Sequence, residues 1–117
     1  MTKDKLTNEN LDGVSLSDAS LSGVDLSKTS LRHAWLSKAD LTDADLSNSD
    51  LHGAHLQGAD LTGADLANAD LSSADLRNSH FENAATTKGA NIEGARGLPP
   101  IETDQLPTDP DDSKPTS

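Results

Sequence analysis

Apolar residues recur at every fifth position over most of the chain. Leucine occupies each place in this series from Leu6 to Leu76, and Phe81 takes the next one. A step of five residues rotates about 140° around an α-helix, so these side chains could not share one helix face. In a continuous strand, five is an odd step, and successive leucines would point to opposite faces. The period therefore excludes both a straight helix and a straight strand.

Small and turn-forming residues accompany the leucines at fixed places. The residue two places before a leucine is usually small, as in Ala44 before Leu46, and two such side chains share a face of a short extended segment. Both can point inward if the chain bends once per repeat. Gly, Asn or Asp, which tolerate turns, stand two places after most leucines. These turn residues are Gly13, Asp18, Gly23, Asp43, Asn48, Gly53, Gly58, Gly63, Asn68, Asn78 and Asn83.

Regular bending predicts a solenoid whose coils stack through backbone hydrogen bonds around a dry leucine and alanine interior. The inward series defines the candidate core. The predicted core residues are Leu26, Leu31, Leu36, Leu41, Leu46, Leu51, Leu56, Leu61, Leu66, Leu71, Leu76 and Phe81. The period indicates the solenoid but leaves the number of sides open.

The repeats resemble the pentapeptide repeat family, in which Ala, then Asp or Asn, then Leu precede two variable residues. Residues 39–43 (Ala-Asp-Leu-Thr-Asp) and 64–68 (Ala-Asp-Leu-Ala-Asn) carry this pattern. The resemblance implies an all-β fold, a right-handed quadrilateral parallel β-helix with twenty residues per coil. Residues 6–85 would then form about four coils.

The N-terminal end departs from the repeat. Asp4 and Glu9 occupy the small inward position, where an unpaired buried carboxylate would be costly. We therefore expect residues 1–10 to form an irregular cap and regular coiling to begin near Leu11.

The C-terminal boundary is marked by a shift in the repeat. The β-helix is expected over residues 11–98, but after Ala84 the pattern resumes one place late at Ala90, which predicts a bulge near 86–89. All five prolines and a cluster of acidic residues lie in 99–117. Proline cannot donate to a ladder, so this tail is expected to be disordered, although its apolar residues could fold back over the open end.

The composition limits the partners. The chain has 20 acidic and 9 basic residues and a formal net charge of −11, so nucleic acid and anionic membranes should repel it, and an electrostatic protein partner should be basic. It has no cysteine, which excludes disulfides and thiolate metal sites. No long apolar run suggests a signal peptide or a membrane span, so we expect a cytoplasmic protein.

Residues twenty apart should stack, so the residue before each leucine builds four exterior columns. The columns, which form the candidate interaction surface, are Asp25, Asp45 and Asp65; Asp50 and Asp70; Asp40 and Asp60; and Trp35, His55 and Asp75. Like charges that face each other in neighbouring coils are mildly destabilising, so the acidic columns need an explanation. They are a solvated face, a surface for a basic protein, or a cation site. The first interpretation also fits the repeat's own preference for Asp.

Chemistry at these columns is limited. His55 beside Asp75 could form a general-base pair, but a convex surface offers no pocket for a substrate, and the four histidines lack recognised metal-ligand spacing. We therefore predict no catalytic residues, no metal and no cofactor. Trp35 is the first candidate for an interface. Phe81 would plug the last coils or support an end-to-end dimer, so both a monomer and such a dimer stay open.

Three functional hypotheses follow. The first is a non-catalytic protein-interaction or scaffold module. The second is a DNA mimic, because some members of the resembled family bind type II topoisomerases such as DNA gyrase and confer quinolone resistance. However, this short stack carries fewer charges than duplex DNA of its length. The third, binding to ice or another flat surface, has only the short column Ser22, Thr42 and Thr62 in its favour.

Overall fold

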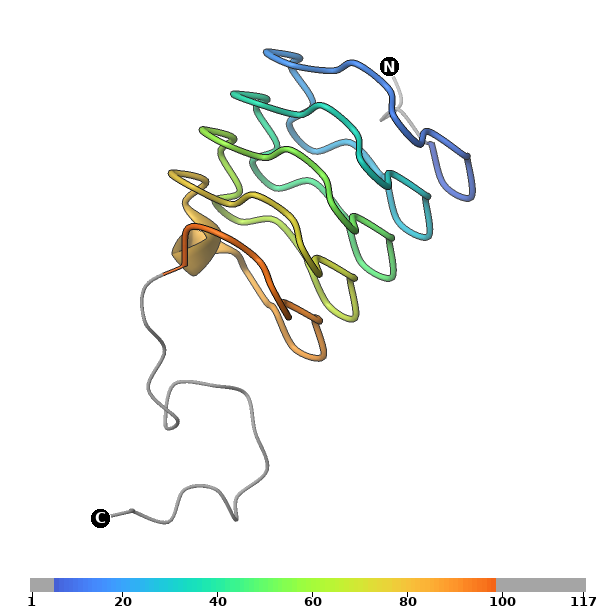
Figure 1. Ribbon diagram of the computed structural model, residues 1–117. Helices are drawn as coiled ribbons and strands as arrows, with labels where there is room; N and C mark the ends of the chain where they lie inside the picture. The colour runs from blue at the N-terminus through green and yellow to red at the C-terminus, as the bar shows by residue number, and fades with distance from the viewer. Residues whose placement is uncertain (1–5, 99–117) are drawn as a thin grey trace, which may run out of the picture.

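The computed structural model describes residues 6–98, which wind into a stack of coils along one axis (Figure 1). Parallel bridges join residues twenty apart, from Asn10 with Ser30 to His55 with Asp75. Each coil therefore contains four five-residue repeats, and a turn at every repeat gives the coil four sides. The expectations of a disordered or folded-back tail over 99–117 lie outside the described residues.

Each repeat makes the same backbone bonds, because its inward leucine is followed by a turn. The amide of Leu41 donates to the carbonyl of Asp60 in the next coil at 3.0 Å, and the amide of Ala44 donates back to the carbonyl of Leu41 at 3.0 Å. Asp43 between them has a positive φ of 59°, as the third residue of a type II turn requires. The extended sides are so short that they pair through single residues.

Some turn positions carry residues that the pattern does not favour. Lys28, His33, Lys38 and Ser73 all have φ between 58° and 60°, a region that costs a residue other than Gly, Asn or Asp roughly 1 kcal/mol or more. Asn83, expected at such a turn, instead lies in a short helix.

The core is a column of leucines and small residues. The leucines from Leu26 to Leu76 are all at most 1% exposed, and the alanines two places before them are equally buried. The first coil is only partly covered, so Leu11 and Leu16 pack against the core half-buried. Phe81 also packs against the core only partly buried, which differs from its predicted fully inward place. An interior sized for leucine would be overpacked by a phenylalanine.

Regular coiling begins earlier than expected. The amide of Leu6 donates to the carbonyl of Asp25 at 2.8 Å, and Asn10 already bridges Ser30. The prediction of an irregular cap was therefore wrong for residues 6–10, while residues 1–5 lie outside the described part. Glu9 is tolerated because its side chain is exposed to solvent, so its carboxylate is not desolvated.

The shift in register is present but lies upstream of the expected bulge. The 3₁₀ helix η1 (Phe81–Asn83) follows His80, which has a left-handed backbone with φ 59°. Beyond η1 the bridges join residues 21 apart, beginning with Asp65 and Thr86. The coil that contains η1 thus has one additional residue, and it is inserted at η1. The predicted position of the bulge at 86–89 was wrong, because those residues again form the regular backbone bonds between coils.

Candidate interaction surface

The predicted surface residues stack in columns but do not form one surface. Repeats ten residues apart lie on opposite sides of a twenty-residue coil, so the column of Asp45 faces away from that of Trp35. The remaining two sides carry the columns of Asp40 and Asp50. Their members are bridged as Asp25, Asp45 and Asp65; Asp40 and Asp60; Asp50 and Asp70; and Trp35, His55 and Asp75.

The aspartate columns have a structural role that sequence reasoning missed. Oδ1 of Asp65 accepts a hydrogen bond from the amide of Ala67 at 3.0 Å, so the carboxylate holds the start of the next turn. Asp45 makes the same bond to Ser47 at 3.0 Å and also accepts its hydroxyl at 2.6 Å. The signal was present in the sequence, since Asp two residues before a Ser or Thr is typical of such local bonds. The same amide bond is made by Asp25, Asp40, Asp50, Asp60, Asp70 and Asp75.

These bonds favour the ionised carboxylates. The hydroxyl of Thr62 lowers the pKa of Asp60, and that of Ser72 lowers the pKa of Asp70, in each case with a contribution from the amide of the same residue. Hydrogen bonds to the charged form stabilise it against protonation. The carboxylates of Asp60 and Asp70 are therefore stabilised in their charged form by the turns that they bond.

The Trp35 column carries the largest exposed apolar side chain of the described residues. Trp35 is 49% exposed, and its indole stacks on the imidazole of His55 with ring centroids 3.9 Å apart and planes at 9°. Its neighbour in the preceding coil is Ser15, whose side chain is too small to stack on the indole. One aromatic face is thus covered from within the chain, and the other has no ring partner in the described part.

Asp75, next in this column, pairs with Arg77 rather than with His55. Nε of Arg77 donates to Oδ1 of Asp75 at 2.8 Å and its Nη2 to Oδ2 at 2.5 Å, while Asp75 is only 7% exposed. The side-chain hydrogen bonds from Arg77 lower the pKa of Asp75 and raise that of Arg77. Within residues 6–98, no hydrogen bond joins His55 to Asp75, so the general-base pair considered from sequence is not formed.

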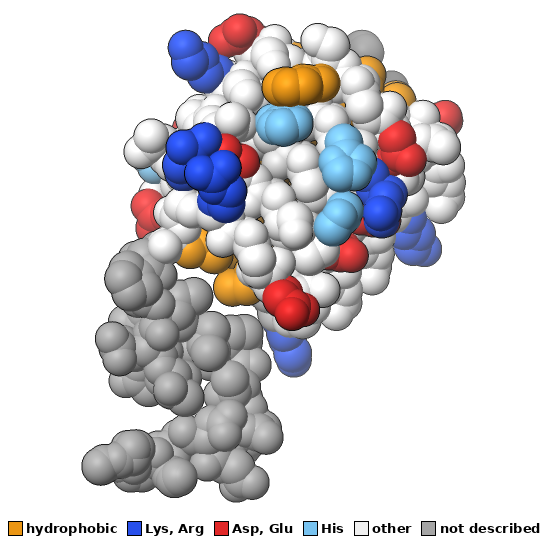
Figure 2. Space-filling model, in the orientation of Figure 1, with side chains coloured by type: hydrophobic (Ala, Val, Ile, Leu, Met, Phe, Trp, Pro, Cys, Tyr) orange, Lys and Arg blue, Asp and Glu red, His pale blue; other side chains and the backbone are white. Residues whose placement is uncertain are grey.

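A polar cluster adjoins the Trp35 column at the neighbouring corner. The rings of His33 and His52 meet edge to face at 5.4 Å, and Nδ1 of His52 lies 2.8 Å from the hydroxyl of Ser72. Arg32 pairs with Asp50 at 3.0 Å, with both side chains substantially exposed, so the pair contributes little stability. Figure 2 looks onto this face, where histidine side chains gather beside an apolar one.

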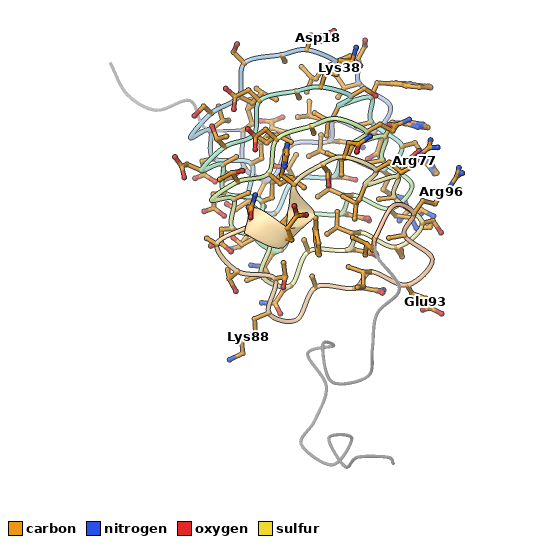
Figure 3. All side chains as sticks on the ribbon, turned by 90° about the vertical axis from the view of Figure 1, so that its left-hand side faces the viewer. Asp18, Lys38, Arg77, Lys88, Glu93 and Arg96 are labelled. Carbon is orange, nitrogen blue, oxygen red and sulfur yellow. The ribbon has the colours of Figure 1, made fainter. Side chains whose placement is uncertain are left out.

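Charge is unevenly distributed around the stack. The side of Trp35, built from repeats 14–18, 34–38, 54–58, 74–78 and residues 95–98, has the bases Lys38, Arg77 and Arg96 and the acids Asp18 and Asp75. Every other side has more acids than bases. Figure 3 shows Arg77 and Arg96 projecting from one side and Lys88 from another.

A hollow of about 370 Å³ lies beside η1 at the C-terminal end of the described residues. Ser79, His80, Phe81 and Glu82 line it together with Leu98, the last described residue. The hydroxyl of Ser79 is buried there without a hydrogen-bond partner in the described part. The described residues contain no grouping of three or more His, Asp or Glu that could hold a metal ion. No helix among them is long and apolar enough to cross a membrane.

Comparison with known proteins gives two levels of likeness. No curated protein matches the chain. A solved structure of QnrB1, a plasmid-mediated fluoroquinolone resistance protein, is 16% identical with a TM-score of 0.30 over 80% of this chain and 72% of that one. Likeness at this level carries no argument about function.

Two solved structures are more similar. Rfr23, a pentapeptide repeat protein from the cyanobacterium Cyanothece 51142, is 33% identical with a TM-score of 0.63 over 79% of this chain, which spans 58% of Rfr23. A pentapeptide repeat protein from the Arabidopsis thaliana thylakoid lumen is 34% identical with a TM-score of 0.54, covering 84% of this chain and 72% of its own.

The sequence profile described as pentapeptide repeats (8 copies) matches residues 5–43, 25–63 and 44–83. These matches agree with the twenty-residue ladder and with the two solved structures. The fold is therefore the right-handed quadrilateral β-helix, and the chain belongs to the pentapeptide repeat family.

Proposed function

We propose that this chain is a non-catalytic protein-interaction module that contacts its partner through the side bearing Trp35. The observation that carries the proposal is the stack of Trp35 on His55. An indole that is 49% exposed, yet held in one orientation by a neighbouring ring, offers a large rigid contact area. Tryptophan is enriched among the residues that dominate binding energy in interfaces, and an ordered side chain loses less entropy on binding.

The aspartate columns support a different role. Their carboxylates accept hydrogen bonds from the backbone of the same coil, as Asp65 does from Ala67. Most of them are thus accounted for by the turns and by solubility. The DNA-mimic alternative gains no support from the charge distribution, because a mimic of duplex DNA needs negative charge all around its rod, whereas the Trp35 side has three bases and two acids.

Site-specific photo-crosslinking of the full chain tests the proposal. A photoreactive phenylalanine replaces Ser37, two residues after Trp35, or Ser47, which has the same place in its repeat on the opposite side and is also half-buried. In lysate from the source organism, position 37 should give protein adducts that position 47 does not. The added substitution Trp35→Ala should abolish them. Equal adducts from both positions, or none from either, would refute the proposed function.

A further inference from the structure

We propose that the Trp35 side binds an acidic segment of a partner protein, with carboxylates seated on the bases around the indole. This inference rests on the proposed function and specifies the partner's chemistry. It is opposite to the basic partner that net charge predicts. The net charge of −11 describes the whole chain, whereas a partner segment at Trp35 meets the charges within a few ångströms of it, since salt screens the more distant ones.

The first support is the chain segment that carries Trp35. Residues 29–39 contain Arg32 and Lys38 and no acidic residue, in a chain where acids outnumber bases by more than two to one. Arg32 and Lys38 flank Trp35 at three residues' distance on either side. Both bases and the indole are exposed. Trp35 thus lies between two bases in a stretch of the second coil without acidic residues.

The second support is the conformation of the flanking residues. His33 and Lys38 occupy the turn positions on the two sides of Trp35 with φ 58° and 60°, where Gly, Asn or Asp would fit without strain. Most other turns in the stack use those residues. The chain therefore holds a histidine and a lysine in a disfavoured backbone on both corners beside the tryptophan, and such strain is concentrated at functional sites.

The acids near Trp35 are largely engaged. Asp50 pairs with Arg32, and Asp75 is nearly buried against Arg77. Asp12, in the preceding coil, accepts the hydroxyl of Ser30 at 2.5 Å and the amide of Arg32 at 2.9 Å. Asp40, two residues after Lys38, accepts the amide and the hydroxyl of Thr42. Asp18 precedes Lys38 in its column (Figure 3).

Lys38 and Arg96 make no ion pair within residues 6–98, so both can bind carboxylates of a partner. Lys38 is in the second coil, and Arg96, which is bridged to Asp75, is three coils further on, both on the Trp35 side. An extended acidic segment running along the column would meet Lys38, the Trp35 and His55 rings, the pair of Asp75 with Arg77, and then Arg96. Opposite charges arranged in this way favour association and fix the direction of the segment.

The test uses Trp35 as its own reporter, because it is the chain's one tryptophan. Deca-glutamate is titrated into the full chain at about 20 mM salt while Trp35 emission is followed, with deca-lysine and deca-thymidylate as parallel probes. Deca-glutamate should change the emission saturably, and raising the salt to about 200 mM should weaken its binding by about tenfold or more. Lys38→Glu should weaken it by about tenfold as well.

Lys88→Glu is the matched control, because it makes the same charge change on the opposite side of the stack. It should leave the affinity within about twofold of wild type. An equal loss with both variants would show that only net charge matters and would overturn the inference. A response to deca-lysine instead, or stronger binding of deca-thymidylate, would also overturn it. The proposed function would survive a deca-lysine response, and the crosslinking experiment tests it independently.

The chain's own acidic residues provide a further control. Residues 99–117 contain Glu102, Asp104, Asp109, Asp111 and Asp112. A full-length variant with these five acids replaced by their amides should show wild-type Trp35 emission without a probe and bind deca-glutamate as wild type does. A shift in emission before any probe is added would identify the chain's own tail as the occupant and overturn the assignment to a partner.

Discussion

The indole of Trp35 and the imidazole of His55 lie face to face, with ring centroids 3.9 Å apart and planes 9° from parallel. The two residues are twenty apart in the chain and are bridged through their backbones. A slip of one residue in the ladder would turn one of the two rings inward and destroy the contact. The stack is therefore a consequence of the coil length, and it couples the exposed surface to the register of the core.

Removing the imidazole should free the indole without unfolding the coil. We expect His55→Ala to shift Trp35 emission to longer wavelength and to lower the free energy of unfolding by only about 0.5–1 kcal/mol, since the pair is partly exposed. Fluorescence spectra and urea denaturation measure the two effects. His80→Asn removes an imidazole outside this column while keeping a residue that tolerates positive φ, and its spectrum should match wild type. Unchanged emission in His55→Ala would contradict the stacked geometry.

The aspartate columns should stabilise the fold through hydrogen bonding rather than charge. Asp65 bonds the amide of Ala67 at 3.0 Å and stands between Asp45 and the neutral Thr86. Asp65→Ala removes the acceptor and should cost about 1 kcal/mol of unfolding free energy. Asp65→Asn keeps an oxygen at the same place and relieves repulsion from Asp45, so it should be neutral or slightly stabilising at low salt.

Urea denaturation at low and high salt distinguishes the two roles of Asp65. The advantage of Asp65→Asn over wild type should shrink at high salt, because screening removes the repulsion, while the loss in Asp65→Ala should persist. Equal losses in Asp65→Ala and Asp65→Asn would show that the negative charge itself is required and would reject the hydrogen-bond explanation.

Much of the fold could be predicted because one physical constraint recurs in every repeat. Leucines five apart, such as Leu41 and Leu46, can be buried together only if the chain turns between them, and twenty-residue coils then stack residues such as Asp45 and Asp65. The position of the extra residue could not be predicted in this way. Phe81 continues the apolar series in the sequence, but it begins η1 and packs only partly buried against the core, so the irregularity begins before the pattern visibly fails.

The candidate site was harder to predict than the fold. The columns follow from the twenty-residue coil that the family resemblance implies, but which carboxylates are engaged depends on local bonds that a column analysis does not include. Asp75 pairs with Arg77 two residues away, and Arg32 reaches Asp50 in the next coil. Lys38 and His33 at positive φ also break the expected turn chemistry. Of these departures, His33 and Lys38 lie at the two corners beside Trp35, as expected if a functional requirement there overrides local preference.

The last coil should separate from the stack when its close approach to Arg77 is blocked. A Cβ at Gly97, where φ is 91°, would lie 2.5 Å from the backbone N and Cα of Arg77. Gly97→Ala should therefore release the carbonyl of Arg96 from the amide of Leu76, now bonded at 2.8 Å. We expect faster hydrogen exchange at Leu76 with little change at Leu46, because an end coil can open alone.

Gly23→Ala is the matched control for this prediction. Gly23 also has a positive φ, of 73°, but a Cβ there would meet nothing within 4 Å. It should lower the unfolding free energy by about 1 kcal/mol from backbone strain alone and leave the exchange of Leu76 relative to other amides unchanged. Identical exchange patterns in the two variants would argue against the close approach at Gly97.

Acid sensitivity should depend on the pair between Asp75 and Arg77. The side-chain hydrogen bond from Arg77 lowers the pKa of Asp75 in the folded state. The stabilisation from this pair is therefore fully present above the unfolded aspartate pKa of about 3.9 and is lost as the pH falls through the lower folded value. Urea denaturation from pH 6 down to pH 2 should show a smaller acid-induced loss for Asp75→Asn, because the titrating group is gone.

Arg77→Gln provides the complementary test, since it leaves the carboxylate in place without its cationic partner. Its acid-induced loss of stability should be smaller than in wild type and should end at a higher pH, because the folded pKa of Asp75 moves toward the unfolded value when the main cause of its depression is removed. Both variants thus reduce the acid-induced loss of stability: Asp75→Asn removes the titrating group, and Arg77→Gln narrows the pH window between its unfolded and folded pKa values. If both variants kept the wild-type curve below pH 4, the pair would contribute nothing to folding, and its burial beside His55 would serve only to shape the Trp35 side.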